Sequence, residues 1–163
     1  MKNLFLLTLA ATSLLFTGCL RNSGCDVDVN TNVDQAQLES DIAAIDAYIE
    51  ENQIQNVQTD PTGIRYVITT EGSGTAPDLC STVGVNYVGK LMSNGNIFDE
   101  SDRTVAFPLS NLIAGWQIGI PKIKSGGSIT LYIPSGYAYG PRQVGSIPAN
   151  SNLIFEIDLI GVQ

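Results

Sequence analysis

Apolar residues recur at helical spacing near the start of the chain, between Asp34 and about Gln53. Intervals of four, three and four residues place them on one face of a helix, and most acids of this stretch lie off that face. The apolar stripe consists of Leu38, Ile42, Ile45 and Ile49. Asp34 is suited to cap the N-terminus of this helix. A stripe this short is typical of a helix docked on its own domain, and the alternative is a dimerisation helix.

Beyond Pro61 the pattern changes to strand-like runs separated by turns. Asn94-Gly95 is a strong turn signal, and Pro108 indicates an edge strand or a bulge. The runs are Ile64–Thr70, Val83–Met92, Val105–Leu109, Ser128–Ile133 and Asn152–Val162. One short stretch, Asn111–Ile120, has helical spacing instead. The predicted fold class is α+β, with an antiparallel β-sheet wrapped around one short helix and preceded by an N-terminal amphipathic helix.

The first eighteen residues have the pattern of an export signal. Lys2 gives the positive start, residues 4–16 form an apolar stretch too short to span a bilayer comfortably, and Thr17-Gly18-Cys19 gives a small-residue end. Small residues directly before a cysteine are similar to the bacterial lipobox, after which the cysteine is lipidated. Phe16 departs from that motif, in which leucine is usual.

We therefore expect a lipoprotein signal peptide over residues 1–18 and a lipid on Cys19. That lipid would anchor the chain to a membrane of the bacterial cell envelope, facing the periplasm or exposed at the surface. The alternative is a plain secretory signal with an incidental cysteine. After the signal peptide we expect a polar tether over 19–33, the helix and a connector over 34–57, and one folded domain over 58–163.

The remaining cysteines, Cys25 and Cys80, form an even pair in a chain expected to be exported. Such a pair in an oxidising compartment predicts a disulfide that ties the tether to the start of the domain. Two free thiols are the alternative, because the sequence does not show whether their Cα atoms come close enough.

The charge and composition of the chain exclude several classes of partner and active site. Sixteen acidic residues against eight basic ones give a formal net charge of −8, which argues against nucleic acid as a partner because phosphate binding needs clustered Lys and Arg. The chain contains no histidine. This excludes Ser-His-Asp triads, histidine-based acid–base catalysis and histidine-ligated metals.

An ordered set of aromatic and polar residues occupies the second half of the chain. Only one acid, Asp99, is built into this set. The set consists of Tyr87-Val88-Gly89, Phe98-Asp99, Ile113-Ala114-Gly115-Trp116, Tyr137-Ala138-Tyr139-Gly140, Ile147-Pro148 and Phe155. In order and spacing it resembles the FK506-binding-protein (FKBP) family of peptidyl-prolyl cis-trans isomerases, from roughly Gly63 to the end. The resemblance implies an FKBP-like fold for residues 58–163 and isomerase activity on proline-containing, unfolded or partly folded proteins.

The resemblance also implies a role for each matching residue. Trp116 would form the floor of a proline pocket, with Tyr87, Phe98 and Phe155 as walls. Leu112, Ile113 and Ile147 would form the apolar rim. Tyr139 would donate its hydroxyl to a substrate carbonyl, Ile113 would offer its backbone N–H to another, and Asp99 would polarise groups around the twisting bond. The family needs no cofactor or metal, and a macrolide is a candidate ligand.

The chain departs from the family pattern at several positions. Val105 stands where many members have a pocket phenylalanine, so that Phe107 is expected to be buried. Ser146 replaces an apolar residue ahead of Ile147. These changes would thin the pocket rim and motivate the alternative function, a catalytically weak proline-peptide binding module or chaperone. A purely structural lipoprotein is disfavoured, because a simple apolar core requires neither Asp99 nor Tyr139.

Overall fold

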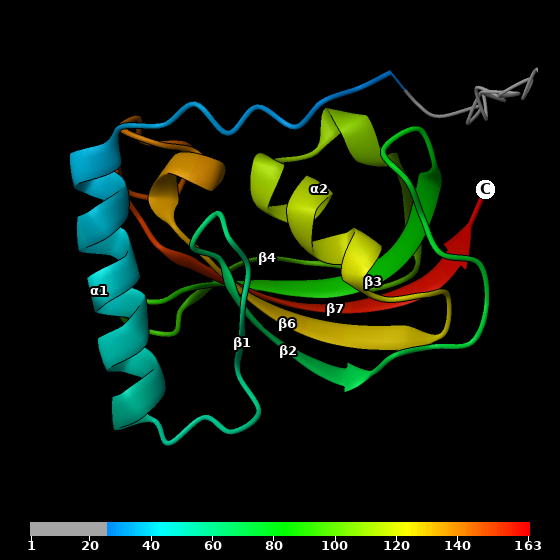
Figure 1. Cartoon of the computed structure of the whole chain (residues 1–163), viewed down its shortest axis with the longest axis horizontal. Coiled ribbons are helices and arrows are strands. Elements are labelled where there is room, and N and C mark those ends of the chain that lie inside the picture. Colours follow the sequence, from blue (N-terminus) through cyan, green and yellow to red (C-terminus); the bar gives the residue numbers. More distant parts are fainter. Residues whose placement is uncertain (1–25) are drawn as a thin grey trace, which may run out of the picture.

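The computed structural model describes residues 26–163, which form one antiparallel sheet with a short helix on one face and a longer helix across one end of the strands (Figure 1). The strands are β1 (Gln58–Thr59), β2 (Arg65–Thr70), β3 (Thr82–Leu91), β4 (Ile97–Glu100), β5 (Val105–Pro108), β6 (Gly127–Ile133) and β7 (Leu153–Val162). The helices are α1 (Gln35–Glu51) and α2 (Ala114–Gly119), with short 3-10 helices η1 (Leu109–Asn111), η2 (Ile120–Lys122) and η3 (Ser135–Tyr137).

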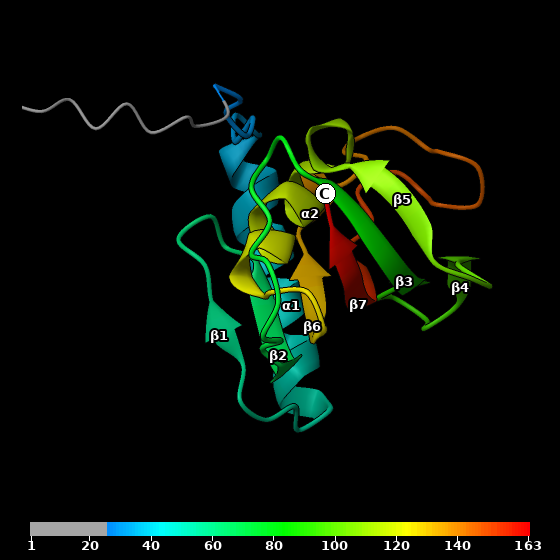
Figure 2. The same cartoon turned by 90° about the vertical axis from the view of Figure 1, so that its right-hand side faces the viewer.

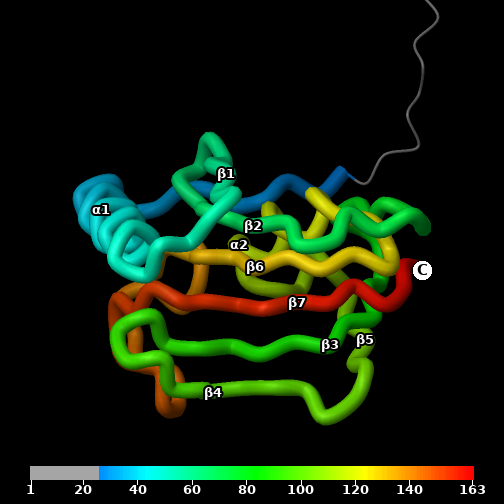
Figure 3. The backbone as a smooth tube through the Cα atoms, turned by 90° about the horizontal axis from the view of Figure 1, so that it is seen from below, coloured from blue at the N-terminus to red at the C-terminus, as the bar shows by residue number. Residues whose placement is uncertain are grey.

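The sheet has seven strands in the order β1-β2-β6-β7-β3-β4, with β5 paired to β3. Figure 3 shows this order from β2 to β4, with the long strands β3 and β7 side by side at the centre. Side chains alternate between the two faces of a strand, so one face of β7 carries the fully or nearly buried Leu153, Phe155, Ile157 and Leu159. This inner face forms the main core together with α2.

Two glycines allow α2 to approach the sheet closely. Gly115 and Gly119 lie one turn apart on the face of α2 that meets β6, and a Cβ added to either would come within 2.5 Å of Ile133 or Leu131. The sheet curves around this short helix, as the view in Figure 2 shows. The close contact places Trp116, between the two glycines in sequence, against the inner face.

Helix α1 lies across one end of the strands rather than along them (Figures 1 and 3). Asp34 caps it, because its Oδ1 accepts the N–H of Gln37 at 3.0 Å. Ile45 is fully buried in a second apolar cluster with Tyr132 of β6 and Ile154 of β7. This cluster lies on the face of the strands opposite to the main core, since both strand residues alternate with core residues.

The sequence predicted the N-terminal helix and five of these strands to within a residue or two. The expected helix over residues 111–120 is shorter, because η1 and η2 take up its two ends. Strands β1 and β4 were not predicted. Within residues 26–163 no helix is long and apolar enough to cross a membrane. The expected signal peptide, Cys19 and Cys25 lie outside the described residues.

Candidate active site

A cavity of about 210 Å³ opens between the inner face of the sheet and the start of α2. It is lined by Tyr87, Asp99, Phe107, Leu112, Ile113, Trp116, Tyr139 and Phe155. Its volume is below the range of about 300–1,000 Å³ that is typical of pockets for drug-sized ligands. Its size and apolar lining therefore suit one small ring better than a large ligand.

A β-bulge in β4 places Asp99 at the cavity and Phe98 against Phe155. In the pairing of β3 with β4, Gly89 faces Asp99 and Lys90 faces Ile97, so Phe98 has no partner of its own. Gly89 makes room there, because a Cβ at this position would lie 2.7 Å from the ring of Phe98 and 2.8 Å from that of Phe155. The bulge thus lets Asp99 reach the cavity while Phe98 supports it from behind.

Aromatic rings packed edge to face form the floor and walls. The ring centroids of Trp116 and Tyr87 are 5.2 Å apart at 81°, and those of Trp116 and Phe155 are 5.2 Å apart at 90°. Phe98 packs edge-on against Phe155 at 5.6 Å. Aromatic pairs favour this geometry, and each contributes about 0.5–1.5 kcal/mol beyond its buried area. The floor is therefore rigid as well as apolar.

The cavity holds one acid–phenol pair. The Tyr87 hydroxyl donates to Asp99 Oδ2 at 2.7 Å. Burial, and then the neighbouring Asp99 carboxylate, raise the pKa of Tyr87 to about 12. Burial and the same carboxylate also raise the pKa of Tyr139 above its ordinary value. Both phenols are consequently protonated hydrogen-bond donors at neutral pH.

Two polar groups at the cavity have no hydrogen bond to residues 26–163. They are the hydroxyl of Tyr139 and the backbone N–H of Ile113, the residue that precedes the first turn of α2. The buried indole N–H of Trp116 also lacks an acceptor within this part of the chain. Tyr139 and Ile113 lie at the cavity wall and are thus available to bind the carbonyl groups of an extended peptide.

Most predicted site residues line this cavity, and two, Phe98 and Ile147, do not. Phe98 packs on Phe155, and Ile147 is 6% exposed within the main core. The expectation that Phe107 is buried is wrong: this ring is half-buried, lines the cavity and packs edge-on against Trp116 at 6.4 Å. The alternation of β5 gives the reason, because residues 105 and 107 share the less exposed face of that strand. The same alternation, read from the sequence, could have identified Phe107.

Cys80, which lies just before β3, is disulfide-bonded. The chain's two other cysteines lie outside the described residues. Pairing of Cys80 with Cys25 therefore stays a prediction.

The family model described as FKBP-type peptidyl-prolyl cis-trans isomerase matches residues 74–160, a span that includes every residue lining the cavity. The chain belongs to this family. It is 39% identical over 137 residues to the FKBP-type isomerase FkpA of Escherichia coli strain K12. The aligned region covers 79% of this chain and 50% of FkpA. A probable FkpA of Neisseria meningitidis serogroup B is 38% identical over 72% of this chain and 44% of its own length.

Among solved structures, a peptidyl-prolyl cis-trans isomerase from Pseudomonas syringae superposes with a TM-score of 0.67. It is 32% identical, and the match covers 86% of this chain and 99% of that one. The chain spans about half the length of the FkpA proteins it matches. The FKBP fold expected from the sequence is confirmed, and α1 lies outside the span that the family model matches.

Proposed function

We propose that this protein is a peptidyl-prolyl cis-trans isomerase that accelerates X-Pro rotation in unfolded or partly folded proteins. The observation that carries the proposal is the small aromatic cavity with Trp116 as its floor and Asp99 as the one acid in its lining. Among the described residues, the lining of this cavity contains no Ser, Thr, Cys or Lys that could act as a covalent nucleophile. It does provide an apolar surface for a proline ring and donors for the flanking carbonyl groups.

The chemistry follows from the peptide bond. Rotation crosses a barrier of about 18–20 kcal/mol, most of it lost amide resonance. In the twisted transition state the carbonyl is less polarised than in the planar ground state. An apolar pocket therefore binds the twisted form in preference to the planar, strongly dipolar one. This is differential binding of the transition state without proton transfer. Lowering the barrier by about 5–8 kcal/mol would accelerate rotation by roughly four to six orders of magnitude.

In this proposal the proline ring rests on Trp116 between Tyr87 and Phe155. Tyr139 and the backbone N–H of Ile113 bind the carbonyl groups on either side of the rotating bond. Asp99 holds the Tyr87 hydroxyl and places a negative charge at the edge of the pocket. Phe107 adds a wall, and Phe98 supports the wall by packing on Phe155.

The test is the rate of cis-to-trans conversion of a short peptide with a hydrophobic residue before proline. We expect the wild-type protein to accelerate it, and Asp99→Ala and Tyr139→Phe each to reduce kcat/KM by about tenfold or more. Tyr66→Phe is the matched control, because the Tyr66 hydroxyl bonds to Gln58 at 3.2 Å, away from the cavity. A folded wild-type protein that binds the peptide without accelerating rotation would favour the binding-module alternative, which Val105 and Ser146 motivate.

We further propose that the protein acts in the bacterial cell envelope, anchored through a lipid on Cys19 and with a disulfide between Cys25 and Cys80. The lipobox-like sequence at 16–19 supports the anchor, and the bonded state of Cys80 supports the bridge. Mass spectrometry of the mature chain is the test. A chain that begins at an acylated Cys19 and shows a peptide linking Cys25 to Cys80 is expected, and an unmodified Cys19 would contradict the anchor.

A further inference from the structure

Helix α1 contributes a buried carboxylate to the body of the protein. Asp41 is 3% exposed, and its Oδ2 accepts both the backbone N–H of Ser135 at 2.8 Å and the Ser135 hydroxyl at 2.6 Å. Its Oδ1 accepts from the Gln37 side chain at 2.8 Å. Both carboxylate oxygens are therefore bound, as a buried charge requires.

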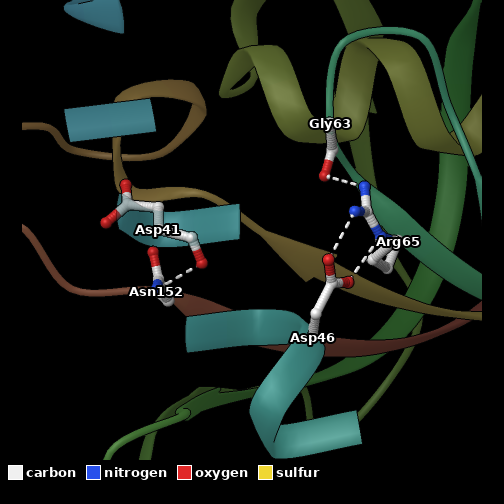
Figure 4. A network of polar contacts seen from close by, with 5 residues as sticks. All are labelled: Asp41, Asp46, Gly63, Arg65 and Asn152. Carbon is white, nitrogen blue, oxygen red and sulfur yellow. Dashed lines mark hydrogen bonds and ion pairs between the residues drawn. The ribbon is translucent and has the colours of Figure 1, made fainter. Parts of the chain in front are cut away.

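Asn152 extends this contact to a second point of the chain. Its Oδ1 also accepts the Ser135 N–H, at 3.0 Å, and its Nδ2 is 3.4 Å from the backbone oxygen of Asp41 (Figure 4). Ser135 begins η3, directly after β6, and Asn152 directly precedes β7. The Asp41 carboxylate therefore holds the start of the stretch between β6 and β7, residues 134–152, which we call the pocket segment. The backbone oxygen of Asp41 accepts from Asn152 at the end of this segment.

The pocket segment carries Tyr139 and Ile147. Inside it, the N–H of Gly140 donates to the Ser135 oxygen at 2.9 Å, and the N–H of Asn150 donates to the Gly140 oxygen at 2.9 Å. A continuous series of hydrogen bonds thus runs from Asp41 to the residue next to Tyr139.

We propose that Asp41 is a positioning residue for the pocket segment, so that α1, which lies outside the family-matched span, sets the geometry of the Tyr139 hydroxyl in the cavity. This inference rests on the proposed isomerase function. Tyr139 is held at the cavity by few other polar contacts, because its hydroxyl has no partner within the described residues. Its place therefore depends on the backbone on which it sits.

A second carboxylate on the same helix provides the matched control. Asp46 forms a two-point ion pair with Arg65 of β2, at 2.8 Å for each nitrogen, and Arg65 also donates to the Gly63 oxygen (Figure 4). This pair fastens α1 to β2 and makes no contact with the pocket segment. Asp41 is buried whereas the Asp46 side chain is half exposed, so each loss of activity is compared with the loss of unfolding free energy in the same variant. A role in helix docking alone predicts that activity falls only as stability falls, whereas a positioning role predicts faster exchange in the pocket segment and lower activity of the folded protein after Asp41→Ala alone.

The experiment compares both variants with the wild-type protein by peptide isomerisation and by amide hydrogen exchange. We expect Asp41→Ala to lower kcat/KM by about tenfold and to speed exchange at Gly140 and Asn150 by a similar factor, with exchange in β3 and β7 unchanged. Asp41→Asn, which keeps one acceptor oxygen, should recover part of the loss, and Asp46→Ala should change neither readout by more than about twofold.

Ser135→Ala removes only the hydroxyl bond and covers the case in which Asp41→Ala does not fold; here we expect about a threefold loss. The proposal is overturned by unchanged exchange at Gly140 and Asn150, or by parallel losses in Asp41→Ala and Asp46→Ala. A folded wild-type protein without isomerase activity would refute the proposed function instead, and the exchange comparison would still decide whether Asp41 orders the pocket segment.

Discussion

The cavity and the contact beneath α1 are built differently. Around the cavity, aromatic rings pack edge to face, whereas beneath α1 an apolar stripe is accompanied by carboxylates that form hydrogen bonds. The cavity floor consists of Trp116, Tyr87 and Phe155, whose rings pack on one another, and the Asp99 carboxylate accepts only at its edge, from the Tyr87 hydroxyl. The α1 contact combines the fully buried Ile45 with the buried Asp41. Both regions are well packed, and in the second a buried carboxylate binds the backbone of a neighbouring segment.

The difference separates two tasks within one site. The sheet and α2 provide the apolar surfaces, which need rigidity and the exclusion of water. The pocket segment provides the Tyr139 hydroxyl, whose direction matters more than its buried area. Polar contacts are directional, so a carboxylate on α1 suits the second task better than further apolar packing would. The following changes should affect one region and spare the other.

Trp116→Ala should have the largest effect. The side chain is 4% exposed and contacts three other rings, so its loss should lower the free energy of unfolding by about 3–5 kcal/mol. It should also abolish measurable acceleration, because the proline ring loses its floor. Urea unfolding and the peptide assay measure the two effects. Activity retained in a folded variant would contradict the assigned role of the indole.

Ile45→Ala should have an intermediate effect on stability and a small one on activity. Removing a fully buried side chain between α1 and Tyr132 should cost about 2–4 kcal/mol. The cavity lies on the opposite face of the sheet, so kcat/KM of the protein that remains folded should change by less than about threefold. Activity that falls as steeply as stability would show that the site depends on α1 as a whole rather than on Asp41.

The smallest effect concerns pH. The pKa of Tyr87 is raised from 10.0 to about 12 in the folded state, so the unfolded chain loses this proton first as pH rises. The contribution of the Tyr87 hydroxyl to the free energy of unfolding is therefore constant below pH 10 and is lost as pH rises toward 12. Tyr87→Phe has no hydroxyl at this position, so its free energy of unfolding should fall less steeply than that of the wild type over that interval. Parallel curves would place the hydroxyl in an environment without net preference for the neutral form.

The sequence predicted the elements in which apolar residues recur at the regular spacing of a helix or a strand. The stripe of α1, its Asp34 cap and the alternating strands follow from residue order alone. The family resemblance that the aromatic motifs carry implied seven of the eight residues that line the cavity, Phe107 being the exception. Short elements were missed: β1 is held by its pairing with β2, and β4 combines four residues with a bulge. Both pair with a strand close by in the chain, but strands of two and four residues are too short for their alternation to be read from the sequence.

Asp41 shows where sequence reasoning could have gone further. It is three residues after Leu38 and four before Ile45, so it lies on the apolar stripe rather than beside it. An acid at that spacing must find partners when the helix docks. Its spacing predicts a buried, hydrogen-bonded carboxylate, but only the tertiary structure identifies Ser135 and Asn152 as its partners.

The most direct test of the account is an NMR titration of the wild-type protein with a proline-containing peptide. It would follow the peptide's cis–trans exchange together with the indole N–H signal of Trp116, the chain's single tryptophan. The account predicts accelerated exchange between the two isomers and a shift of the indole signal that saturates over the same range of peptide concentration. Accelerated exchange without a change at Trp116, or a saturating shift without acceleration, would contradict catalysis in this cavity.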